Sequence, residues 1–327
     1  MIKSVEELKL ALTEGQNKCL IALNGTLHHE SPPLYHYTDL SAGLSILEKS
    51  SLRFTDIKYC NDPEEFENGL KIFNRMSDEI LNIYLEKSPS FTHVMILIRH
   101  ILNFSTSFKH IEGQSLLRAK DNLSKFGIDS TKILYKKLSI FVCCLSERGD
   151  DLRQWLPYAN DGCGVALGFK EMNNNQHNFT IEDNTWAIKV CYESEAKKEK
   201  YVIDIFDRAY SVFNDMDPSL IPEFAVNIFR AMLFDIIACK SINYRDEDEW
   251  RLIRIENADS GLEEVNFRIK DNIIRPYIEV PIVKESLLEF KLGPKTEDNL
   301  NVHALNRVIT KFEYTNTKIV KSKISYR

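Results

Sequence analysis

The stretch LSIFVCCLSERGDDLRQWLPYANDGCGVALGF, residues 138–169, contains two strand-like runs separated by a short polar and aromatic segment. The run at 138–146 is rich in β-branched and aromatic residues, and GVALGF at 164–169 follows a turn with two glycines. The stretch therefore predicts two buried strands joined by a segment that carries Trp155 and Tyr158. Aromatic residues on such a connection either form the wall of a pocket or pack into the core, and the pattern favours neither.

The remaining segments place strands toward both ends of the chain, with helices between them. Helical spacing of apolar residues predicts helices at about 64–136, 195–213, 219–238 and 297–309. Strand-like runs return after residue 248, and there is no internal repeat and no Gly/Ser linker. This order indicates one α+β domain over residues 1–327, with the helical block at about 64–136 as a subdomain.

Composition and residue spacing argue against a nonspecific nucleic-acid-binding protein and against a metalloprotein. The chain has 327 residues and a formal net charge of −6, which argues against strong nonspecific binding to nucleic acid, although a local basic groove remains compatible. The seven cysteines form no CxxC pair, and the histidines show no metal-ligand spacing. We therefore expect no metal site and a reducing, cytoplasmic environment.

The chain carries no predicted targeting or membrane segment. MIKSVEELKLALTEG, at the N-terminus, is interrupted by charged residues and does not resemble a signal peptide. The most apolar stretch, VMILIRHIL at 94–102, is much shorter than the roughly 20 residues of a membrane helix. We expect a protein without a membrane anchor.

Two short segments hold candidate functional side chains. In YHYTDL, His36 lies between two tyrosines just before a helix-like run. A neutral imidazole donates through one nitrogen and accepts through the other, which suits a ribose hydroxyl. Taken alone, however, such a histidine more often satisfies backbone groups in a packed aromatic turn.

The second segment is YRDEDEWRLIRI, residues 244–255. If it is a strand, alternation places Glu247, Glu249 and Arg251 on one face, and Trp250 on the other, toward the core. A carboxylate at the start of a strand that becomes apolar is typical of the rim of a cleft. The alternative is a solvated acidic turn that leads into an edge strand.

Together these segments resemble the bacterial family DUF2971. The resemblance rests on four motifs in order, from about residue 33 to 327: LYHYTDL with a following NDPEE, then CLSERGDDLRQWLPYANDGCGVALGF, then EDEWRLI, and finally RPYIEVPI with FKLGP and SKISYR. That family in turn is similar to a distant branch of the ADP-ribosyltransferase superfamily. The resemblance implies an ADP-ribosyltransferase-like split β-sheet cleft that binds NAD, with a large inserted helical block.

The same resemblance implies roles for particular residues. His36 matches a histidine on the first strand of the superfamily, and Glu249 matches the glutamate of a later strand, although Glu247 is an alternative. Tyr158 is the first choice for the middle position, before Ser146 and Trp155. We expect the residues that contact NAD to be His36, Tyr37, Thr38, Ser146, Trp155, Tyr158 and Arg251.

The implied activity is cleavage of the bond between nicotinamide and ribose. The transition state resembles the oxocarbenium ion of glycoside hydrolysis, and a fixed carboxylate stabilises the charge that develops there. ADP-ribose then passes to an acceptor that the sequence does not identify, and the resemblance implies a bacterial toxin or an anti-phage defence effector. The alternatives are a non-catalytic module that binds a ligand or partner through the same cleft, and a scaffold in which these residues are bonded to one another with no cavity between them.

Overall fold

The computed structural model describes residues 2–13, 33–60, 63–106, 138–170, 185–192, 194–257, 264–270 and 272–326. Its strands are β1 (Leu34–Thr38), β2 (Ser51–Asp56), β3 (Leu138–Ser146), β4 (Val165–Phe169), β5 (Thr185–Lys189), β6 (Glu249–Asn257), β7 (Asn266–Lys270), β8 (Ile273–Pro281), β9 (Leu287–Leu292) and β10 (Lys318–Lys321). Its helices are α1 (Val5–Thr13), α2 (Leu40–Lys49), α3 (Pro63–Lys87), α4 (Pro89–Thr106), α7 (Leu152–Tyr158), α8 (Glu195–Asp215), α9 (Ile221–Ala238) and α10 (Asp298–Lys311). Short 3-10 turns are η1 (Ile57–Tyr59), η2 (Pro218–Leu220), η3 (Ile242–Glu247) and η5 (Lys284–Ser286).

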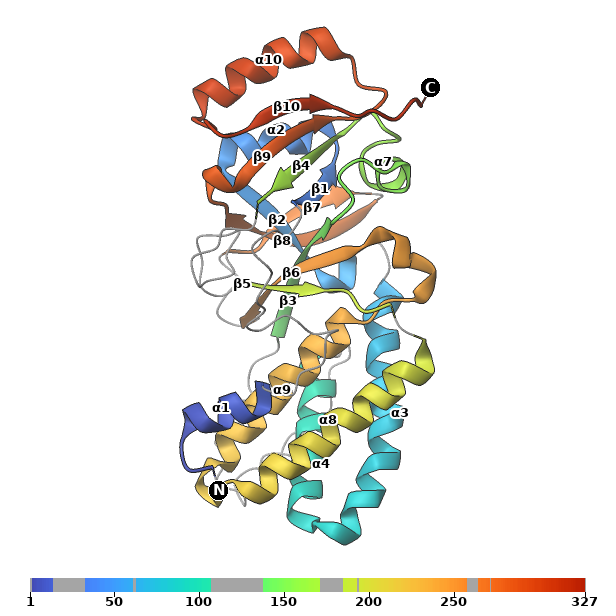
Figure 1. Cartoon of the computed structure of the whole chain (residues 1–327), viewed down its shortest axis with the longest axis vertical. Helices are drawn as coiled ribbons and strands as arrows, with labels where there is room; N and C mark the ends of the chain where they lie inside the picture. The colour runs from blue at the N-terminus through green and yellow to red at the C-terminus, as the bar shows by residue number, and fades with distance from the viewer. Residues whose placement is uncertain are drawn as a thin grey trace.

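The molecule is a mixed α+β structure in which one large, open, mostly antiparallel sheet meets a body of helices (Figure 1). The expected strands at 138–146 and 164–169 are confirmed as β3 and β4, and the helix expected at 297–309 is α10. The expected helical block begins with α3 and α4, which pack against α8 and α9 from later in the chain. Residues 107–136 of that block lie outside the described part of the chain.

The sheet forks at β3. β6 pairs with β3 along its whole length, from Leu138 opposite Asn257 to Ser146 opposite Glu249, and so occupies one edge of that strand. β1 and β2 must therefore share the other edge: β1 pairs at Ser146, and β2 pairs at Phe141 and Val142. From β1 one branch continues through β4, β9 and β10, and from β2 the other continues through β8 and β7.

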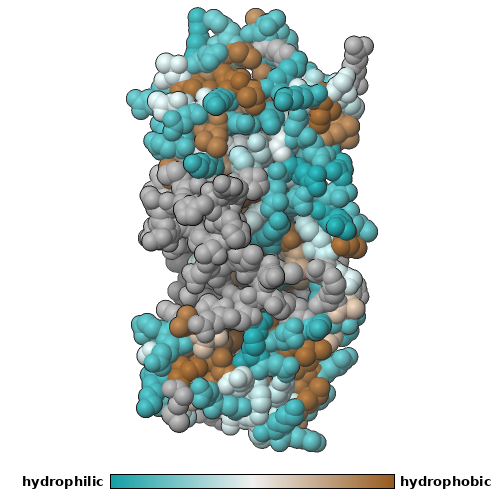
Figure 2. Space-filling view, viewed as in Figure 1, coloured by the Kyte–Doolittle hydropathy of each residue, from teal (hydrophilic) through white to brown (hydrophobic). Residues whose placement is uncertain are grey.

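Two apolar layers cover the faces of the sheet. One face of β3 and β6, with Ile140, Val142 and Ile253, packs against the helical body. The opposite face, with Phe141 and Leu252, belongs to a second core that also contains residues of α2 and α10. Figure 2 shows hydrophobic side chains of this view gathered over the helical body and near the α10 end, with hydrophilic side chains between them on the side of α7.

The connections beside the fork are fixed by local geometry. Asp39 caps α2 by accepting a hydrogen bond from the backbone of Ala42 at 2.7 Å, and Ser50 ends the helix in a left-handed conformation with φ 50°. After α7, Gly162 adopts φ 82°, which favours glycine. A Cβ at Gly164 would lie 2.3 Å from the carbonyl oxygen of Thr38, so that glycine allows close approach of the protein's own backbone.

Candidate functional site

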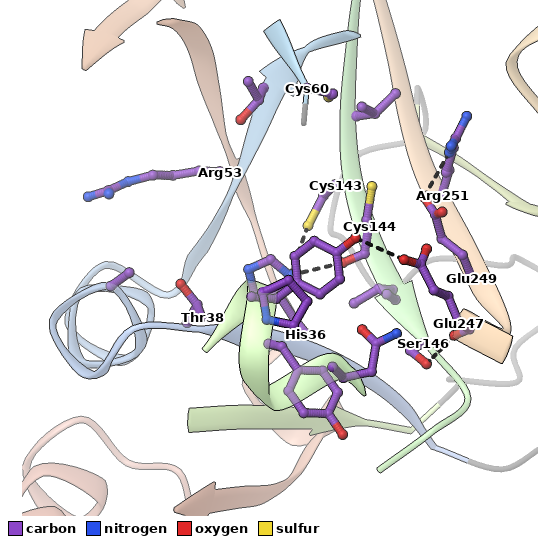
Figure 3. A pocket seen from close by; sticks show the side chains of 18 of the residues that line it. His36, Thr38, Arg53, Cys60, Cys143, Cys144, Ser146, Glu247, Glu249 and Arg251 are labelled. Carbon is purple, nitrogen blue, oxygen red and sulfur yellow. Dashed lines mark hydrogen bonds and ion pairs between the residues drawn. The ribbon is translucent and has the colours of Figure 1, made fainter. Parts of the chain in front are cut away.

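A cavity of about 550 Å³ lies at the fork, a volume typical of small-molecule sites. Side chains from both branches, from β3 and β6, and from α7 and η3 line it (Figure 3). Of the residues expected to bind NAD or to act in catalysis, seven line this single cavity: His36, Tyr37, Thr38, Ser146, Tyr158, Glu249 and Arg251. The structure therefore brings together residues that are more than 200 positions apart in the sequence.

His36 fills part of the gap between the two branches. Its Nδ1 lies 3.0 Å from the carbonyl oxygen of Cys144, in the segment of β3 between the residues that pair with β1 and with β2. A carbonyl only accepts, so Nδ1 carries the hydrogen and Nε2 of the neutral ring is an acceptor. Burial lowers the pKa of His36, which keeps the ring neutral at pH 7. The residue thus caps an open strand edge and retains one acceptor nitrogen.

A buried lysine joins the two candidate glutamates. Nζ of Lys240 donates to Oε2 of Glu247 at 2.6 Å and to Oε2 of Glu249 at 2.7 Å. The side chains of Lys240 and Glu249 are 7% and 6% exposed, and that of Glu247 is 16% exposed. Sequence reasoning missed Lys240, which follows α9 in an irregular segment where no periodicity places its side chain.

Arg251 holds the other oxygen of Glu249. Its Nε donates to Oε1 of Glu249 at 2.8 Å, and another guanidinium nitrogen donates to the carbonyl of Ile237. Burial alone would raise the pKa of Glu249, but the positive charges of Arg251 and Lys240 outweigh burial and hold it well below its ordinary value. Glu249 is therefore a fixed anion throughout the neutral pH range.

Both candidate acids, Glu247 and Glu249, line the cavity. The strand-like run expected after residue 248 is confirmed: η3 ends at Glu247, Asp248 has φ 42°, and β6 begins at Glu249. Glu247 therefore belongs to the 3-10 turn and not to the strand. The expected alternation holds from Glu249 onward, where Trp250 joins the core on the opposite face. Glu247 lies close to Glu249 because η3 ends at Glu247 and because Lys240 donates to both carboxylates.

Tyr158 and Ser146 both hold Glu247. The hydroxyl of Tyr158 donates to Oε1 of Glu247 at 3.0 Å, and burial and the nearby Glu247 raise the pKa of this phenol. The hydroxyl of Ser146 donates to the backbone carbonyl of Glu247 and accepts from the backbone of Arg148. Ser146 thus positions the acid, and Tyr158 contacts it on the cavity wall.

The position of Trp155 corrects one expectation. Trp155 is fully buried, lies outside the lining of the cavity and donates through Nε1 to Asp150 at 2.8 Å. It packs edge-to-face against Tyr37, with ring centroids 4.8 Å apart. Tyr37 does line the cavity, but its hydroxyl donates to the carbonyl of Arg148 at 2.6 Å. Both aromatic residues therefore support the wall, and Trp155 has no access to a ligand.

Three arginines that the sequence analysis missed line the part of the cavity that the β2–β8–β7 branch forms. They are Arg53 on β2, Arg268 on β7 and Arg275 on β8. Figure 3 shows Arg53 on one side of His36, with Glu249 and Arg251 on the other. The alternating pattern NFRIK at 266–270, two positions before IIRPY, was a signal for a hairpin that would place Arg268 and Arg275 together.

The described residues offer neither a metal-binding cluster nor a membrane-spanning helix. Within them, no three His, Cys, Asp or Glu side chains are grouped so that they could hold a metal ion. No helix in the described ranges has an apolar stretch that is long enough to cross a bilayer.

Comparison with known proteins supports the resemblance noted from the motifs. Residues 154–252 match the model of a family described as "Protein of unknown function (DUF2971)". The match runs from α7 into β6 and so includes Tyr158, Lys240, Glu247 and Glu249, whereas His36 and the three arginines lie outside it. No curated protein and no solved structure matches the chain.

Proposed function

We propose that the protein is an NAD-dependent, ADP-ribosyltransferase-like enzyme that cleaves the bond between nicotinamide and ribose. The observation that carries the proposal is the single cavity at the sheet fork, which an anionic Glu249 and a neutral His36 both line. The fork supports an ADP-ribosyltransferase-like split sheet as the finer fold class. The acceptor of ADP-ribose is a macromolecule or water.

The reaction balances with NAD and a nucleophile alone. The bond between C1′ and the nicotinamide nitrogen breaks, its electron pair leaves with nicotinamide, and a lone pair of the acceptor forms the new bond to C1′ as the acceptor loses a proton. Positive charge develops on the ribose as the bond breaks. An ionised carboxylate that is held in place before the reaction stabilises this charge without reorganisation, which is the role of Glu249.

The other residues orient the substrate. Nε2 of His36 accepts a hydrogen bond from a ribose hydroxyl, because Nδ1 already donates to Cys144. The ring of Tyr158 forms the cavity wall beside the acids and offers an apolar surface for nicotinamide. Arg251 and Lys240 keep the acid ionised, so they act through Glu249.

A non-catalytic binding module is the second candidate, and one observation favours it. Both carboxylate oxygens of Glu249 already accept hydrogen bonds, from Lys240 and from Arg251. A carboxylate that is fully engaged in this way stabilises an adjacent positive charge less than one with a free oxygen. Under this alternative, the cavity binds a nucleotide-like ligand or a protein partner without breaking a bond.

The test is release of nicotinamide from NAD by the purified full chain, with and without a cell lysate as a source of acceptors. Wild type should release nicotinamide, and Glu249→Gln should lower the rate by about two to three orders of magnitude. Glu256→Gln, on the same strand outside the cavity lining, is the matched control. Melting curves establish that each variant is folded at the assay temperature.

Two results refute the enzymatic proposal. One is a wild-type protein that releases no nicotinamide under any of these conditions. The other is a folded Glu249→Gln variant that releases it at the wild-type rate. Calorimetric binding of NAD without turnover would support the binding module instead.

A further inference from the structure

The three arginines of the cavity share one face of the β2–β8–β7 branch. Arg268 lies directly opposite Arg275 in the antiparallel pair of β7 and β8. On β8, alternation places Arg275 on the same face as Tyr277 and Glu279, and Glu279 is the partner of Arg53 on β2. Guanidinium groups from three adjacent strands therefore converge on one wall of the cavity.

Counting the described residues alone, the cluster carries more positive than negative charge. Glu279 lies 3.7 Å from Nε of Arg53, but it is also bound at 2.6 Å by Lys49. Arg268 donates to the hydroxyl of Thr55 at 3.1 Å, and in the described part of the chain it makes no ion pair with a carboxylate. Its Nε is buried and has no hydrogen-bond partner among the described residues.

Arg268 and Arg275 repel each other across the β7–β8 pair, and a bound anion would relieve this repulsion. Like charges directly opposite each other in a sheet are destabilising, and Arg275 is only 8% exposed. Burial and the positive charges of Arg53 and Arg275 lower the pKa of Arg268. Groups whose charge is disfavoured by burial and by neighbours of the same sign are typical of functional sites.

We propose that Arg53, Arg268 and Arg275 form a binding site for a phosphoryl group. The planar fork of a guanidinium pairs with two phosphate oxygens at once, and several such groups suit an anion with more than one negative charge. Nε of Arg268, which has no hydrogen-bond partner within the described ranges, supplies a donor for this anion. This site would exist whether or not the cavity cleaves a glycosidic bond.

Two sources could deliver the phosphoryl group to this wall. The first is the diphosphate of a dinucleotide whose ribose lies at His36, since Arg53 and Glu249 flank that histidine (Figure 3). The second is the phosphate of a separate ligand, such as a phosphorylated acceptor. Both present the same chemistry to the arginines.

The experiment is isothermal titration of the full chain at constant ionic strength with inorganic pyrophosphate, ADP-ribose and adenosine. Wild type should bind the two phosphorylated probes, and adenosine should bind much more weakly. Arg268→Met and Arg275→Met should each weaken pyrophosphate binding by about tenfold or more. Arg153→Met is the control, because Arg153 is exposed, pairs with Asp151 and lies outside the cavity lining.

The ADP-ribose arm identifies the source. If both arginine variants lose ADP-ribose and pyrophosphate in parallel, and the two probes compete, the wall binds the dinucleotide's own diphosphate. If ADP-ribose binding survives while pyrophosphate binding is lost, the wall binds the phosphate of a separate ligand. The inference is overturned if wild type fails to bind pyrophosphate, or if folded Arg268→Met and Arg275→Met bind it as wild type does.

The outcome is independent of nicotinamide release. A protein that binds pyrophosphate through Arg268 but releases no nicotinamide keeps the phosphoryl site and loses the proposed reaction. A protein that releases nicotinamide without binding pyrophosphate keeps the proposed reaction and loses the phosphoryl site.

Discussion

The two ends of the cavity differ in how their charges are balanced. At the acid end, Lys240 and Arg251 surround Glu247 and Glu249, so two positive and two negative groups are joined by hydrogen bonds at 2.6–2.8 Å. At the arginine end, Arg53, Arg268 and Arg275 share one cavity wall, and Glu279 is divided between Arg53 and Lys49. The first end is complete within the protein, whereas the second gains from an anion that arrives from outside.

In these proposals, the acid end is preorganised for catalysis, and the arginine end is suited to bind an anion. A carboxylate whose partners are part of the fold needs no rearrangement when a positive charge develops beside it. A cluster of like charges instead stores repulsion that a ligand relieves. The following predictions test this difference through stability, from the largest expected effect to the smallest.

Lys240→Met should give the largest loss, because it leaves the buried Glu249 beside the partly buried Glu247 without their shared cation. Removing one partner of a buried ionic network costs about 3–5 kcal/mol in the free energy of unfolding. Urea denaturation followed by circular dichroism measures this loss. Lys189→Met is the control, since Lys189 is 43% exposed and pairs with Glu147, and it should cost about 1 kcal/mol or less. Equal losses in the two variants would contradict the buried network.

The pH dependence of stability should follow Glu249. Because its pKa is lowered in the folded state, its contribution is fully present above the ordinary glutamate pKa of about 4.3 and is lost as the pH falls below that value. The titratable and charged groups near it include Lys240, Arg251, Cys144, Tyr158, Tyr192 and Glu247. Denaturation between pH 7 and pH 3 should show a smaller decline in Lys240→Met than in wild type. Parallel curves would mean that Lys240 does not set this pKa.

Tyr158→Phe should cost about 1 kcal/mol in the free energy of unfolding. It keeps the ring on the cavity wall and removes only the hydrogen bond to Glu247. Tyr326→Phe removes a similar bond to Asp161 at the surface and should change stability less. Thermal melts of the two variants give the comparison, and a neutral Tyr158→Phe would show that solvent replaces the lost donor.

Arg268→Met should have the smallest effect, within about 1 kcal/mol of wild type. The variant loses the hydrogen bond to Thr55 but also loses the repulsion from Arg275, and these changes oppose each other. Urea denaturation in a phosphate-free buffer gives the value. A loss as large as that of Lys240→Met would show that the arginine end is compensated within the protein, which would remove the contrast between the two ends.

The sequence predicts local elements well and spatial neighbours poorly. β3 follows from its β-branched and aromatic run, and the start of β6 follows from the alternation of Glu249, Trp250 and Arg251. The fork is not predictable in this way, because it depends on which distant strand pairs with which part of β3. The expectation that His36 and Glu249 share a cavity came from the resemblance of ordered motifs and not from periodicity.

The residues that were missed have physical reasons for being inconspicuous. β7 is five residues long and mostly exposed, so its alternation was too short to stand out beside the longer strands. Arg268 and Arg275 meet only when the hairpin closes. Trp155 shows the opposite error. Its aromatic side chain suits the wall of a ligand site, but the hydrogen bond to Asp150 and the packing against Tyr37 hold it in the core.

The attachment of the two branches to β3 also determines where the sheet opens locally. β1 is joined to that edge at Tyr35 and Ser146, and β2 at Thr55 and Asp56 only, whereas β6 is joined along nine residue pairs. Separating a branch from β3 therefore disrupts few pairs, and α2, which connects β1 to β2, limits how far they can part. Backbone amides beside the fork should exchange with deuterium sooner than those in the middle of the β3–β6 ladder, and a molecule lodged between the branches should slow that exchange.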